Sequence, residues 1–190
     1  MRLFASISPS TQAREHLLGA LRPISADLGP DLRWTDPQQW HLTLAFYGEQ
    51  PEGAIEDLLG HLAMAAAGAR AMELNLRGAG SFNRRNLWVG VGGETPMLKQ
   101  LMADCLLDPS ERSRQRAHLT VARNQRGRQR GWDPVLDDVV HALAVYQGPD
   151  FPVTQIDLVK STLGAGRGGE PRYEVLASVP LAAQHIDAGY

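Results

Sequence analysis

The chain carries the same four-residue phrase twice, and this repetition constrains the fold more than any other feature. The first phrase is His41-Leu42-Thr43-Leu44 and the second is His118-Leu119-Thr120-Val121. Side chains alternate between the two faces of a strand. A strand would therefore place the His and Thr of each phrase on one face and the two apolar residues on the other, against a core. Two such strands facing each other predict a pocket with two imidazoles and two hydroxyls.

These side chains suit the handling of a phosphodiester. An imidazole can give or take a proton near neutral pH, and hydroxyls can donate hydrogen bonds to phosphate oxygens. The alternative is two half-buried strands whose histidines are each satisfied by a neighbour. The chain has only 6 His in 190 residues, so a chance repetition of the whole pattern is rare. We therefore favour the functional interpretation.

Composition restricts the class of protein. The chain is long enough to bury a good core, and we expect one two-lobed domain over residues 1–190. The single cysteine, Cys105, rules out an internal disulfide, and its apolar surroundings predict a buried thiol. No apolar run approaches the length of a membrane span, and the first residues have too short an apolar stretch for a signal peptide. We expect a cytoplasmic monomer with no membrane contact.

Positive charge is concentrated around the second phrase. Residues 112–130 contain seven arginines and no acidic residue, although the net charge of the chain is -2. Such a segment is typical of a surface that attracts phosphates or nucleic acid. The alternative is compositional, because the whole chain favours arginine over lysine.

Strand and helix patterns are interspersed without steady alternation, which predicts an α+β fold with antiparallel sheets. The two phrases are 77 positions apart, which indicates two similar lobes facing across a central cleft, with helices outside. The periodicity predicts strands over residues 2–7, 32–34, 41–46, 73–77, 87–91, 117–123, 151–163 and 173–179, and helices over residues 11–21, 51–67, 96–107 and 134–145.

Both phrases and several further segments resemble the two-histidine phosphoesterase superfamily. Within it, the chain is similar to the RNA 2′,3′-cyclic phosphodiesterases, also called 2′-5′ RNA ligases or LigT-like proteins. The similar segments extend over nearly the whole chain: Met1-Arg2-Leu3-Phe4, Arg33-Trp34, residues 40–49, 82–85, 87–91, 118–123 and 172–176.

The resemblance implies a bilobal fold that hydrolyses RNA 2′,3′-cyclic phosphate ends to 2′-phosphomonoesters, with reversible 2′-5′ ligation as a further activity. The expected substrate is RNA with a cyclic phosphate end or a cyclic nucleotide, and no metal or cofactor is expected. His41 would be the general acid and His118 the general base. The residues expected to bind the substrate are Thr43, Thr120, Arg123 and Tyr173.

The residues themselves leave two rival functions open. One is a zinc site at His41 and His118, although nothing near them supplies a third ligand at metal-site spacing. The other is a non-catalytic module that binds RNA ends or nucleotides in the same cleft. Two positions depart from the relatives: Ala117 replaces a common proline, and Trp40 replaces a smaller residue and is expected to influence which base fits.

Overall fold

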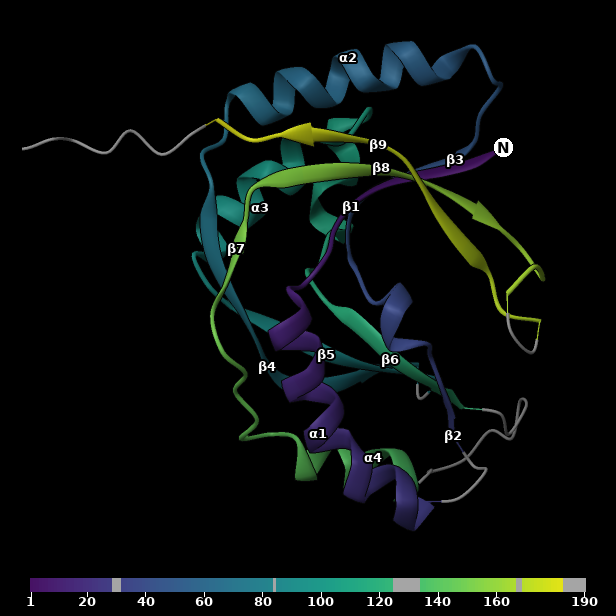
Figure 1. The fold of residues 1–190 in the computed structure, drawn as a ribbon, viewed down its shortest axis with the longest axis vertical. Helices are drawn as coiled ribbons and strands as arrows, with labels where there is room; N and C mark the ends of the chain where they lie inside the picture. The colour runs from purple at the N-terminus through teal and green to yellow at the C-terminus, as the bar shows by residue number, and fades with distance from the viewer. Residues whose placement is uncertain (29–31, 84, 125–133, 167–168, 183–190) are drawn as a thin grey trace, which may run out of the picture.

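Two antiparallel sheets lie across from each other, with helices against their outer sides, as the α+β prediction requires (Figure 1). The computed structural model describes residues 1–28, 32–83, 85–124, 134–166 and 169–182. The strands are β1 (Arg2–Ile7), β2 (Leu32–Trp34), β3 (Leu42–Glu49), β4 (Met72–Phe82), β5 (Asn86–Gly93), β6 (Leu119–Asn124), β7 (Phe151–Val153), β8 (Gln155–Thr162) and β9 (Arg172–Pro180). The helices are α1 (Thr11–Leu28), α2 (Ala54–Ala67), α3 (Thr95–Asp104) and α4 (Pro134–Ala142), with 3-10 turns η2 (Pro37–Gln39) and η3 (Pro109–Arg114).

The two sheets are interleaved along the chain. The four-stranded sheet has the order β3-β1-β8-β9 and the five-stranded sheet the order β2-β6-β5-β4-β7. The chain leaves the four-stranded sheet after β1, returns to it at β3, and returns again at β8. Each lobe is therefore assembled from separate segments, which explains why the two halves of the sequence do not resemble each other outside the phrases.

The helices cover the outer sides of the sheets. Helix α2 packs on β8 and β9, whereas α1 and α4 pack against β4 at the opposite end of the molecule (Figure 1). The apolar residues of both phrases are buried, with Leu42 1% and Leu119 0% exposed, as alternation predicts. No helix in the described ranges combines the length and the hydropathy needed to cross a membrane.

Cys105 lies in the core at the end of α3, as predicted. The side chain is 0% exposed. Burial, together with the neighbouring Asp104 carboxylate, raises the pKa of the Cys105 thiol to about 12. The thiol is therefore protonated at neutral pH and packs as a small apolar group.

The prediction of one long strand over residues 151–163 is wrong. The segment is divided at Thr154: β7 pairs with β4 in the five-stranded sheet, whereas β8 pairs with β1 and β9 in the four-stranded sheet. An apolar pattern that continues through Thr154 carries no information about which sheet each half joins. Pro152 lacks an N–H, and β7 lies at the edge of its sheet, where a missing donor costs least.

Candidate active site

The two phrases meet at one pocket between the sheets. His41 directly precedes β3 and His118 directly precedes β6, one residue outside each strand rather than within it. The pocket has a volume of about 200 Å³. All six site residues predicted from the sequence line it, namely His41, Thr43, His118, Thr120, Arg123 and Tyr173.

The two imidazoles are held by the same local hydrogen bond. His41 Nδ1 lies 2.8 Å from the carbonyl oxygen of Gln39, and His118 Nδ1 lies 2.8 Å from that of Arg116. A carbonyl oxygen can only accept, so Nδ1 carries the proton in both rings. In the neutral form, this leaves each Nε2 with a free lone pair. Each ring can therefore take a proton at Nε2, or give one there once it is charged.

Aromatic side chains orient both rings. His41 makes an edge contact with Tyr173 and a tilted contact with Phe4, each at 4.9 Å between ring centroids. His118 makes an edge contact with Phe82 at 4.8 Å and a longer one with Trp88 at 6.4 Å. Each pair comes from the sheet that carries its histidine, so each ring is supported by its own lobe.

Trp88 needs the glycine opposite it. Gly80 faces Trp88 across the β4–β5 ladder, and a Cβ at Gly80 would lie 2.3 Å from the indole ring. A side chain at this position would displace the indole that helps to orient His118.

The electrostatic setting of His41 differs from that of a solvated imidazole. Burial lowers the pKa of His41 from its usual value of 6.5, and repulsion from His118 lowers it further. The hydrogen bond to the Gln39 carbonyl acts in the opposite direction but does not compensate. Without a bound anion, His41 is therefore mostly neutral at neutral pH.

A β-bulge follows the threonine of each phrase. In β3, Thr43 pairs with Ser6 and Ala45 pairs with Ala5, so Leu44 is the extra residue. In β6, Val121 is the extra residue in the same way. A bulge interrupts the alternation of side chains and re-aims those that follow it.

The bulges add a further residue to the pocket face of each strand. Strict alternation from Thr43 would bury Phe46 and expose Ala45, but Phe46 is 48% exposed and Ala45 only 4%. The corresponding residue of β6 is Arg123, which is exposed and lines the pocket. Each strand and the residue before it thus present three side chains to the two adjoining pockets: a His, a Thr two positions on, and a third residue five positions on from the His.

Phe46 lies in a second pocket that opens beside the first. Its volume is about 210 Å³, and it shares His41, Thr43, Arg123 and Tyr173 with the first pocket. The Arg2 guanidinium stacks over the Phe46 ring, 4.7 Å from its centroid. The site therefore continues from the imidazoles onto an exposed aromatic face with a cation against it.

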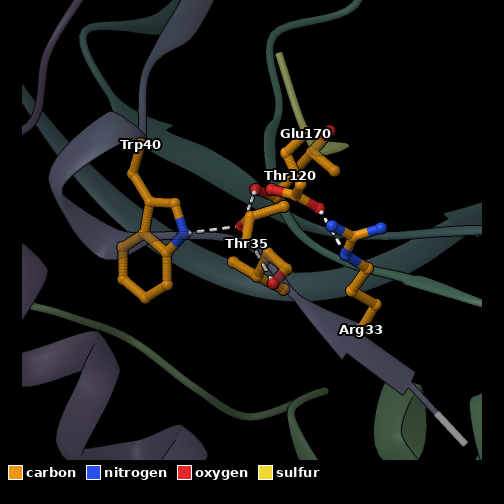
Figure 2. Close-up of polar contacts among 6 residues, drawn as sticks. Arg33, Thr35, Trp40, Thr120 and Glu170 are labelled. Atoms are coloured by element: carbon orange, nitrogen blue, oxygen red, sulfur yellow. Dashed lines mark hydrogen bonds and ion pairs between the residues drawn. The ribbon is translucent and has the colours of Figure 1, made fainter. Parts of the chain in front are cut away.

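Two polar residues of the pocket lining, Thr35 and Glu170, were missed by sequence reasoning (Figure 2). Glu170 lines the pocket, and its carboxylate pairs with the Arg33 guanidinium at 3.2 Å. Thr35 also lines the pocket and accepts a hydrogen bond of 2.8 Å from the Trp40 indole. Trp40 also lines the pocket, although its side chain is only 3% exposed. A carboxylate and a threonine outside the phrases carry no recognisable pattern in the sequence.

The arginine-rich segment is described only in part. Arg126, Arg128 and Arg130 lie outside the described residues. Arg112 and Arg116 line a separate hollow of about 480 Å³, together with Lys99 of α3. Within the described ranges, no group of three or more His, Cys, Asp or Glu side chains is placed to hold a metal ion.

Comparison with known proteins found similar sequences and similar structures. The family model described as LigT like Phosphoesterase matches residues 7–88, which include the first phrase. The RNA 2′,3′-cyclic phosphodiesterase of Geobacillus stearothermophilus is 27% identical over 188 residues. That match covers 94% of this chain and 56% of the relative, so the chain spans about half of the relative's length.

Solved structures share the fold. TT0787 of Thermus thermophilus is 25% identical with a TM-score of 0.70, and the match covers 97% of this chain and 100% of that one. Escherichia coli LigT, complexed with 3′-AMP, is 24% identical with a TM-score of 0.67, covering 95% of this chain and 97% of LigT. The fold, the two His-Thr phrases and these relatives together support assignment of the chain to the two-histidine phosphoesterases. Within that class, the chain is similar to the LigT-like phosphoesterases.

Proposed function

We propose that the chain hydrolyses RNA 2′,3′-cyclic phosphate ends to 2′-phosphomonoesters without a metal ion. One observation carries this proposal: two imidazoles with Nδ1 committed to backbone carbonyls line the same pocket from opposite sheets. A cyclic phosphate is strained and already activated. Its hydrolysis needs one base for the attacking water and one acid for the departing ribose oxygen.

The proposed reaction uses both histidines in opposite forms. Neutral His118 takes a proton from water through Nε2 while the water oxygen attacks phosphorus. The bond from phosphorus to the ribose 3′ oxygen breaks, and protonated His41 gives its Nε2 proton to that oxygen. The phosphate stays on the 2′ oxygen, and a proton transfer through solvent restores both rings. Attack and departure in line require groups on opposite sides of phosphorus, which the two sheets can supply.

The lowered pKa of His41 bears on its role as the acid. In the free protein, burial holds this ring mostly neutral, which opposes proton donation. A bound phosphodiester anion favours the charged imidazole and raises its pKa. Binding of the substrate anion would therefore favour protonation of His41, and the protonated ring can then act as the acid.

The remaining pocket residues suit the phosphate. The hydroxyls of Thr43 and Thr120 would donate to the non-bridging oxygens, whose negative charge increases as water attacks. The Arg123 guanidinium would add charge-assisted hydrogen bonds at the same group. Tyr173, in edge contact with His41, would limit water around the acid.

The nucleoside would occupy the adjoining pocket. Phe46 offers an exposed ring on which a base can stack, and the Arg2 guanidinium covers one face of this ring. The named activity of the Geobacillus stearothermophilus relative and the 3′-AMP complex of Escherichia coli LigT support a nucleotide substrate.

Incubation with adenosine 2′,3′-cyclic phosphate and an excess of chelator tests the proposal. We expect turnover at the rate observed without chelator. Loss of turnover that added zinc or manganese restores would contradict metal independence. Binding of the cyclic nucleotide without turnover would instead indicate a non-catalytic module that uses the same cleft.

A further inference from the structure

A single hydroxyl outside the phrases connects one phrase to the other. Thr35 Oγ1 accepts a hydrogen bond of 2.8 Å from the Trp40 indole N–H. The same hydroxyl donates toward the carbonyl oxygens of Thr120 and Val121, at 3.1 and 3.0 Å (Figure 2). Trp40 directly precedes His41, whereas Thr120 and Val121 belong to the second phrase. Thr35 therefore links the beginning of the first phrase to the end of the second.

A second link joins the opposite ends of the phrases. The Gln115 side-chain amide donates to the carbonyl oxygen of Leu44 at 2.9 Å and to that of Met102 at 2.6 Å. Leu44 is the last residue of the first phrase, and Gln115 lies three residues before His118. The two phrases thus run in opposite directions across the pocket. Thr35 connects them at one end, and Gln115 connects them at the other.

Two of the four accepting carbonyls belong to bulge residues. Leu44 and Val121 are the extra residues of β3 and β6. A bulge leaves the extra residue outside the regular ladder. A buried carbonyl needs a hydrogen-bond partner, and here each partner comes from a segment outside the strand.

We propose that Thr35 and Gln115 are positioning residues that fix the separation of His41 and His118. The inference rests on the proposed two-histidine hydrolysis, in which base and acid flank one phosphorus atom. The histidines lie on different sheets, so their spacing depends on contacts between the sheets. A displacement of about 1 Å at such a site can cost on the order of a hundredfold in rate.

Substitution of the hydroxyl separates positioning from general stability. Thr35→Val keeps the shape of the side chain and the backbone hydrogen bond of residue 35 to Val121, but removes the bonds of the hydroxyl. We expect kcat to fall by about tenfold to a hundredfold, with KM within about twofold of the wild type. Thr35→Ser restores the hydroxyl and should return most of kcat.

Tyr47→Phe is the matched control. Tyr47 is buried in β3, and its hydroxyl donates to the Cys105 carbonyl at 3.0 Å, away from both histidines. This variant should lose thermal stability but keep kcat. If Thr35→Val lowers the melting temperature as Tyr47→Phe does and leaves kcat unchanged, Thr35 is structural and the proposal is wrong. An equal loss of kcat in Thr35→Ser and Thr35→Val would also overturn it.

Two further measurements cover other failures. If Thr35→Val does not fold, Trp40→Phe removes the indole donor and keeps the buried ring, and a several-fold loss of kcat is expected.

If the wild type does not turn over cyclic phosphate, the proposed hydrolysis fails independently. Titration with inorganic phosphate, followed by NMR of both imidazoles, then decides the positioning. In the wild type, the signals of both imidazoles should respond to the same bound phosphate. Thr35→Val should weaken this binding of phosphate, and unchanged phosphate binding would contradict the inference.

Discussion

The two phrases share their chemistry and differ in what surrounds it. Both have Nδ1 bonded to the carbonyl two residues back, and both have a bulge after the threonine. The first continues to Phe46, an exposed ring, whereas the second continues to Arg123, a cation. We propose that the repeated part performs the reaction, and that the unlike residues five positions after each His, Phe46 and Arg123, distinguish the two ends of the substrate.

The scaffolding of the two phrases is also unequal. Strand β3 is an edge strand of its sheet, so the Gln115 amide can reach the Leu44 carbonyl from the open side. Strand β6 is covered by β2, and the chain that continues from β2 brings Thr35 to the Val121 carbonyl. The bulge carbonyl of each phrase is therefore hydrogen-bonded by a different kind of segment. This is expected if the site requires the bulge geometry itself.

The largest expected effect tests whether both phrases are needed. His41→Ala and His118→Ala should each lower kcat by about a hundredfold or more, because each removes a group that moves a proton in the transition state. His16→Ala is the control, since His16 bonds to Tyr146 outside the pocket. Near-normal turnover by either variant, with chemistry limiting the rate, would break the equivalence of the two phrases.

The hydroxyls should show the next largest effect. Thr43→Val and Thr120→Val keep the shape of the side chain but remove a donor to the phosphate, so kcat should fall by about tenfold to a hundredfold. Thr154→Val alters an exposed residue outside the pocket and should have no effect. Normal rates in both pocket variants would mean that the hydroxyls serve only the fold.

Substitution of Arg123 and of Phe46, the residues five positions after each His, should separate binding of the phosphate from binding of the base. Arg123→Gln should weaken inhibition by inorganic phosphate and by nucleotides alike, by about tenfold to a hundredfold, because a charged hydrogen bond is lost. Phe46→Ala should raise the KM for a cyclic nucleotide by about tenfold but leave phosphate inhibition unchanged, because only stacking is lost. Equal effects of the two variants on both ligands would refute this division of labour.

Much of this arrangement is visible in the sequence. The repeated phrases predicted that His41, Thr43, His118 and Thr120 share a pocket, and the interspersed helix and strand patterns predicted the α+β class. The resemblance added Arg123 and Tyr173, which line the same pocket. Alternation failed at the bulges: it could not place Phe46 beside Thr43, because an extra residue in a strand depends on pairing with a distant partner. Pairing is also the reason that the division at Thr154 was missed. The role of Thr35 could not be predicted from the sequence, because it depends on which carbonyl oxygens the hydroxyl contacts in the folded chain.

The smallest expected effect concerns the electrostatics of the more buried histidine. NMR titration should place the pKa of His41 below 6.5, and His118→Ala should raise it, because the like charge is removed. The folded protein binds this proton less readily than the unfolded chain. The free energy of unfolding should therefore fall as the pH drops from 6.5 through the lowered pKa. A His41 midpoint above 6.5 in the free protein would contradict the burial argument.

Phosphorus NMR of the reaction product tests the central claim most directly. The wild type, with chelator present, should convert a nucleoside 2′,3′-cyclic phosphate to a single isomer with the phosphate on the 2′ oxygen. One acid and one base on opposite sides of phosphorus allow only one ring bond to break. A mixture of isomers would contradict the two-sided arrangement. A product that is mainly the 3′-phosphate would reverse the roles assigned to His41 and His118.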